Sequence, residues 1–191
     1  MRLSTAISAV ILAFMVSPLL AAPSGFSPDD PRHARLRALR DAATALFDSD
    51  DYALSMSQKT RDAWTRLHDA AIRVKVGGRP HPLAGIALIN LSSMDQIDGR
   101  NPDALTHASA GLALLEPFAD AYPIGWMQGL SIKGYVQTAL GDVAGGAATL
   151  AQASAYMDGY IARTPAEKLD KDAHMLRSNI AFSHAQALSR L

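Results

Sequence analysis

The chain has 191 residues, a hydrophobic content of 49% and a formal net charge of zero at pH 7. This length suits one globular domain, and the hydrophobic content excludes a disordered chain and predicts a buried core. The neutral charge argues against a nucleic-acid-binding protein, which needs a basic surface to displace counterions from phosphates. The sequence contains no cysteine, so disulfides, thiolate metal ligands and a lipidated N-terminal cysteine are excluded.

Residues 1–22 have the plan of a secretory signal peptide. Arg2 supplies a positive start, residues 6–16 are apolar except for one serine, and small residues precede the expected cleavage near Ala21 or Ala22. The apolar run is shorter than the roughly 20 residues that span a bilayer. We therefore expect an exported, periplasmic protein whose mature chain has no stable membrane insertion. Residues 23–31 contain three prolines and two aspartates and are expected to form a disordered lead-in.

Residues 32–191 are predicted to be helical nearly throughout, because apolar residues recur at three- and four-residue steps and no alternating run predicts a strand. The expected helices cover residues 32–47, 52–76, 83–97, 105–122, 126–140, 147–161 and 169–191. Pro117 is expected to kink the fourth of these, which continues through Phe118 and Tyr122. The segment 164–167, Thr-Pro-Ala-Glu, is expected to cap the last helix as a capping box.

The helix pairs repeat loosely along the chain. One set of residues aligns with a second at a constant offset: Leu88, Ser92, Gly99, Ala104, Ala108 and Gly111 with Leu130, Gly134, Gly141, Gly146, Leu150 and Ala153. Small residues fall where paired helices are expected to cross closely, and a glycine falls at each turn between them.

This pattern resembles the tetratricopeptide repeat family. The best match is Leu140-Gly141-Asp142 followed by Ala147 and Ala153, while the prolyl residue at 117 stands where the family often ends its second helix. The repeats are longer than the family period of about 34 residues, and leucine and alanine replace its large aromatics. The resemblance is best over residues 83–162. It implies an all-α, right-handed solenoid over residues 32–191, with about three helix pairs and a C-terminal capping helix.

The resemblance also implies a concave groove that holds a peptide or a partner helix. The groove residues it implies are Asn90, Ser93, Gln128, Ser131, Tyr135 and Asn179. Further inner positions are Ile86, Ile89, Ile97, Ile132, Thr138, Ser178 and Phe182. A side-chain amide there can pair with both the donor and the acceptor of a peptide backbone. The alternative interpretation of these residues is ordinary packing and capping.

The leading hypothesis is thus an exported scaffold or adaptor that binds a protein or peptide. Self-association is also possible, because three helix pairs are near the minimum for a stable stack. No catalytic motif is present, and no enzyme activity, metal or cofactor is expected.

A small-ligand- or metal-binding helical protein, possibly hydrolytic, is the alternative. It depends on two pairs one helical turn apart, Asp103 with His107 and Asp170 with His174. Two ligands are fewer than zinc requires, so surface ion pairs are the favoured interpretation of both.

Overall fold

Amphipathic and fully apolar segments alternate along the chain, and in the computed structural model they form stacked helices. The structure describes residues 25–169 and 171–191, so the expected signal peptide, residues 1–22, lies outside the described residues. The α-helices are α1 (Ala34–Phe47), α2 (Tyr52–Ser55), α3 (Gln58–Ala71), α4 (Leu83–Ile97), α5 (Asn101–Leu115), α6 (Pro123–Ala139), α7 (Val143–Arg163) and α8 (Lys171–Leu188).

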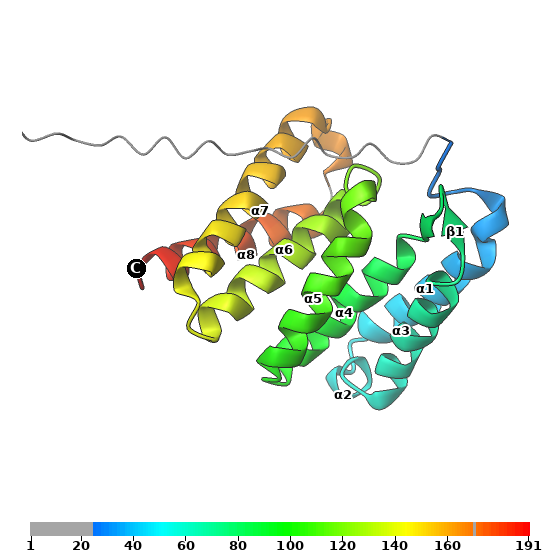
Figure 1. Ribbon diagram of the computed structural model, residues 1–191, viewed down its shortest axis with the longest axis horizontal. Coiled ribbons are helices and arrows are strands. Elements are labelled where there is room, and N and C mark those ends of the chain that lie inside the picture. Colours follow the sequence, from blue (N-terminus) through cyan, green and yellow to red (C-terminus); the bar gives the residue numbers. More distant parts are fainter. Residues whose placement is uncertain (1–24, 170) are drawn as a thin grey trace, which may run out of the picture.

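The helices stack in two layers. Helices α1, α4, α6 and α8 follow one another in one layer, and α3, α5 and α7 form the other (Figure 1). Each helix packs against the next along the chain, α4 on α5 and α6 on α7 most extensively. The predicted all-α helical solenoid is therefore confirmed as the fold class. None of the described helices combines the length and apolar character needed to cross a membrane.

Small residues let the paired helices cross closely, as the repeat predicted. In the pair α6 and α7, a Cβ atom added to Gly134 would lie 3.0 Å from the Gly146 carbonyl oxygen. At the equivalent place in α4 and α5, the Ser92 hydroxyl donates a hydrogen bond of 2.7 Å to the Ala104 carbonyl. Backbones this close exclude any larger side chain at the crossing.

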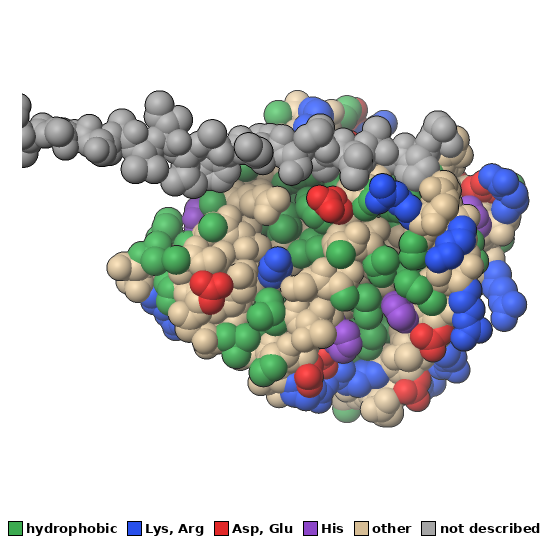
Figure 2. Space-filling view, viewed as in Figure 1, with side chains coloured by type: hydrophobic (Ala, Val, Ile, Leu, Met, Phe, Trp, Pro, Cys, Tyr) green, Lys and Arg blue, Asp and Glu red, His purple; other side chains and the backbone are tan. Residues whose placement is uncertain are grey.

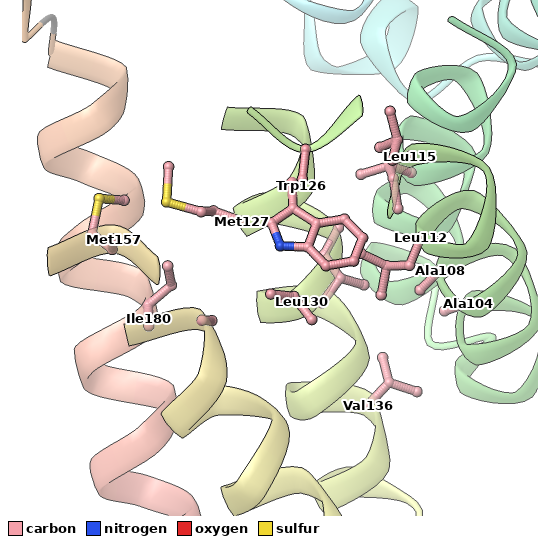
Figure 3. Packing of buried hydrophobic residues seen from close by; sticks show 14 residues of the cluster. Ala104, Ala108, Leu112, Leu115, Trp126, Met127, Leu130, Val136, Met157 and Ile180 are labelled. Atoms are coloured by element: carbon pink, nitrogen blue, oxygen red, sulfur yellow. The ribbon is translucent and has the colours of Figure 1, made fainter. Parts of the chain in front are cut away.

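Most of the described core belongs to two neighbouring clusters, and a small third cluster joins α7 to α8. The first lies between α5, α6, α7 and α8, where Trp126 and Met127 pack among leucines and alanines of the adjoining helices (Figure 3). The second lies between α1, α3 and α4 around Trp64 and Leu67. Burying each large side chain stabilises the fold by about 1.5–3 kcal/mol, so these clusters hold the stack together.

The helix expected over residues 52–76 is wrong, because the chain breaks it twice. The Asp51 carboxylate caps α2 and the Ser57 hydroxyl caps α3, so two helices begin where one was expected. After α3, β1 (Lys75–Val76) pairs antiparallel with β2 (Arg79–Pro80) in a short hairpin. Its two-residue Gly-Gly turn has positive φ at both positions, the geometry of a tight hairpin turn.

Two expected helix boundaries are also wrong. The helix before Pro117 does not kink and continue, because a 3₁₀ turn at Glu116–Phe118 ends it before α6 begins. Proline has no N–H to continue the α-helical hydrogen bonding. The Thr164 hydroxyl donates backward to the Tyr160 carbonyl at 2.8 Å and does not cap the last helix, which begins at Lys171.

The described part of the expected lead-in lies against the helices. The Phe26 ring is 5.0 Å from the Phe118 ring and 5.9 Å from that of His81, both edge to face. The Arg37 guanidinium donates to the Pro28 carbonyl oxygen at 3.3 Å. These contacts join residues 25–33 to the first helix and to the turn after α5.

Candidate functional site

A groove with a volume of about 800 Å³ runs across the layer of helices α1, α4, α6 and α8, which we call the inner helices. Helices α1, α4, α6 and α8 each contribute side chains to it, and Trp64 of α3 joins them. A volume of this size lies within the range of ligand and peptide sites, which is about 300–1,000 Å³.

The structure brings the six predicted groove residues together around this one groove. Asn90 and Ser93 come from α4, and Asn179 comes from α8. Helix α6 supplies the other three, Gln128, Ser131 and Tyr135. Their binding of a partner stays a prediction.

Of the further predicted inner positions, some line the groove and others do not. Ile86, Ile132 and Phe182 also line the groove, whereas Ile97 and Ser178 do not. Two further positions, Ile89 and Thr138, are buried in helix contacts. Ile89 lies in the core cluster around Trp126. The Thr138 hydroxyl donates to the Gly134 carbonyl at the α6–α7 crossing. Both residues therefore serve the packing of the stack.

Sequence reasoning missed one wall of the groove. Helix α1 contributes Arg40, Thr44, Phe47 and Asp48. Trp64 belongs to an apolar stripe of α3, a pattern typical of core packing. Its ring lies edge to face with that of Phe47 at 6.4 Å. The stripe periodicity predicts burial, but it does not reveal that this ring also borders a groove.

Several polar groups in the groove are free to bind a ligand. The Asn90 amide nitrogen donates to the Ile86 carbonyl at 3.0 Å, which leaves its amide oxygen available. Within the described residues, the side chains of Gln128 and Asn179 form no hydrogen bond. The buried indole Nε1 of Trp64 also has no acceptor among the described residues. The half-buried amides of Asn90 and Gln128 and the exposed amide of Asn179 are accessible to a ligand, whereas the Trp64 Nε1 is too deeply buried to meet one.

Apolar side chains stand exposed beside these amides. Phe182 is 71% exposed and Met175 is 60% exposed, both on α8, while Tyr135 of α6 is 37% exposed. Exposed apolar side chains clustered at a groove are typical of interaction surfaces.

Charge is confined to the two outer walls of the groove. Helix α1 contributes Arg40 and Asp48, and α8 contributes Lys171 and Asp172, so each wall carries one base and one acid. Helices α4 and α6 contribute no charged side chain to the groove. Elsewhere on the surface, Lys and Arg side chains gather at the end of the molecule formed by α1 and α3 (Figure 2).

A separate ion network, centred on the buried Asp95 carboxylate, joins α3, α4 and α5. The Asp95 carboxylate is 2% exposed and accepts hydrogen bonds from Arg61 at 2.7 Å and Arg100 at 2.6 Å. His107 Nδ1 lies 2.7 Å from the same carboxylate. Burial raises the pKa of Asp95, but the hydrogen bonds from Arg100, His107 and Arg61 outweigh it and the net pKa is lowered. These partners satisfy the hydrogen bonding of the Asp95 carboxylate, so the network holds α3, α4 and α5 together.

The network also changes the interpretation of the candidate metal half-sites. His107 pairs with Asp95, and Asp103 lies 3.9 Å from Arg100. Asp170, the expected partner of His174, lies outside the described residues. Across residues 25–169 and 171–191, no three His, Asp or Glu side chains are grouped so that they could hold a metal ion.

Two histidines, the buried His81 and the half-buried His33, lie together at the N-terminal end of α4. The rings of His33 and His81 are 4.6 Å apart, edge to face, and the Leu83 N–H donates to His81 Nδ1 at 3.2 Å. Burial, together with His33 and Arg37 nearby, lowers the pKa of His81 to about 4. Neither the groove nor a smaller hollow between α7 and α8 is lined by this pair. We assign it a role in packing.

No protein family, curated protein or solved structure matched the chain in comparisons. The groove is therefore interpreted from its own geometry and chemistry.

Proposed function

We propose that the protein is an exported helical-repeat module that binds a protein or peptide in the groove across α1, α4, α6 and α8. One observation carries this proposal: a single groove receives side chains from all four inner helices. It combines unpaired amides with exposed apolar side chains. Such a mixture is typical of polypeptide recognition, in which apolar anchors supply affinity and polar groups supply register.

The helical stack supports the resemblance of this fold to the tetratricopeptide repeats. Consecutive helices pack in pairs, glycines occupy the turns at Gly99 and Gly141, and small residues occupy the crossings. In such stacks the inner helices present a continuous binding surface. Export depends on the leader-like residues 1–22, and an envelope protein is the partner we propose.

Affinity capture tests the proposal. The tagged full-length protein is used to capture partners from envelope extract, beside the double variant Asn90→Ala/Tyr135→Ala. The control is Tyr52→Ala, which removes a ring that is 68% exposed and outside the groove. We expect partners captured by the wild type and by the control to be lost from the double variant. Equal capture by all three proteins would refute the groove as the binding surface.

A further inference from the structure

The chemistry of the groove specifies its occupant more closely than the proposed function does, and the inference that follows rests on that function. We infer that the groove holds an extended, uncharged stretch of polypeptide with apolar side chains near its two ends. Three properties of the lining carry this inference: where the charges lie, where the free amides lie and where the apolar side chains lie.

The charges exclude an acidic or basic ligand segment. The floor of the groove, formed by α4 and α6, has no charged side chain, and the base and acid on each wall balance one another. A charged ligand group over the floor would lose its hydration without meeting an opposite charge. Phosphate groups, acidic tails and nucleic acids therefore do not complement this surface.

The amides favour an extended segment over a helix. Three amides lie one on each of the later inner helices, Asn90 on α4, Gln128 on α6 and Asn179 on α8, and α4 also contributes Gln96. A helix uses its own N–H and C=O groups internally, whereas an extended chain leaves them free to pair with side-chain amides. The three amides thus form a row that an extended chain meets in succession as it crosses the helices.

The apolar side chains stand at the two ends of this row. Phe47 lies on the α1 side, edge to face with the buried Trp64 ring, and Met175 and Phe182 lie on α8. Packed helices are about 8–10 Å apart, so the path from α1 to α8 is about 24–30 Å. At about 3.3 Å per residue this path corresponds to about seven to nine extended residues. A ligand that fits has apolar side chains near both ends of such a segment.

Selection from a display library of random peptides of about nine residues tests the inference on the immobilised full-length protein. Binding is measured by the fluorescence of Trp64 in Trp126→Phe, because the chain has two tryptophans and only Trp64 lines the groove. If Trp126→Phe does not fold, the difference between the wild type and Trp64→Phe gives the same signal.

We expect the selected peptides to lack charged residues at their centre and to carry apolar residues near both ends. Placing one Asp or Lys at the centre is expected to weaken binding about tenfold or more. Methylating the central backbone nitrogens should weaken binding to the wild type by about tenfold. It should weaken binding to Gln128→Ala/Asn179→Ala less than binding to the wild type, because two of the three paired amides are gone.

Other outcomes separate this inference from the proposed function. Enrichment of acidic, basic or amphipathic helical peptides that still bind the groove would overturn the inference and leave the function standing. Equal binding of methylated and unmethylated peptides would do the same. A folded protein that enriches no peptide and captures no partner from envelope extract would overturn both.

Discussion

Two glycines of helix α7 should respond in opposite ways to the same substitution. A Cβ atom on Gly146 would lie 2.6 Å from the Gly134 carbonyl oxygen and 2.9 Å from the Thr138 backbone nitrogen. A Cβ atom on Gly159 would meet only the end of the Arg163 side chain, at 3.4 Å. The added Cβ atom on Gly146 would also meet the Thr138 hydroxyl, but the backbone of α6 cannot rotate away, whereas the Arg163 side chain beside Gly159 can move.

The magnitudes follow from two opposing effects. Alanine is favoured over glycine inside a helix by about 1 kcal/mol, and both positions gain this. At Gly146 the added methyl forces α6 and α7 apart, which costs about 1–3 kcal/mol. We expect Gly146→Ala to lower the free energy of unfolding by up to about 2 kcal/mol. Gly159→Ala is expected to raise it by about 0.5–1 kcal/mol.

Urea denaturation followed by circular dichroism measures both changes. For a domain of this size, each kcal/mol corresponds to a shift of about 2–4 °C in Tm, so thermal melts give an independent check. An unchanged dependence on urea would show that the variants unfold from the same compact state. If Gly146→Ala stabilised the protein as much as Gly159→Ala, the close approach of α6 and α7 would be refuted.

Three further predictions concern other parts of the molecule. Because burial disfavours charged His81, the free energy of unfolding should fall by about 3 kcal/mol as the pH drops from 6.5 to 4, and His81→Gln should abolish most of this slope in urea titrations. Asp95→Asn should lower the free energy of unfolding, measured by urea denaturation, by about 2–3 kcal/mol. Asp69→Asn, at an exposed position, should lower it by less than about 0.5 kcal/mol. Equal losses would contradict the role of Asp95 in joining α3, α4 and α5. Phe26→Ala should speed amide hydrogen exchange in residues 30–37, and unchanged rates would refute the anchoring of this segment.

The repeat was predictable because helix crossings restrict residue size directly. Where Gly134 meets Gly146, no larger residue fits, so the need for close approach is written in the sequence itself. The same holds for the turns at Gly99 and Gly141, whose positive φ favours glycine. Proline at 117 marked a boundary, but the predicted kinked continuation was wrong, because a 3₁₀ turn ends the helix there.

The groove was predictable only in part. The repeat alignment placed Asn90 and Gln128 on inner helices, since residues at equivalent helical positions share a face. The α1 wall and the border formed by Trp64 depend on how the first two long helices pack against α4, which no repeat in that region indicated. Asp95 was missed for the same reason, although an acid within an otherwise apolar helix signals a buried partner.

The sequence by itself determined the all-α class, the pairing of neighbouring helices and most of the inner positions of α4, α6 and α8. Helical periodicity and residue size are local properties, and they act over one or two turns of the chain. The tertiary structure alone decided the shape of the groove, the ion network around Asp95 and the packing of the Phe26 ring against the Phe118 ring. These features bring together residues far apart in the chain, and their distances depend on the packing of the whole stack.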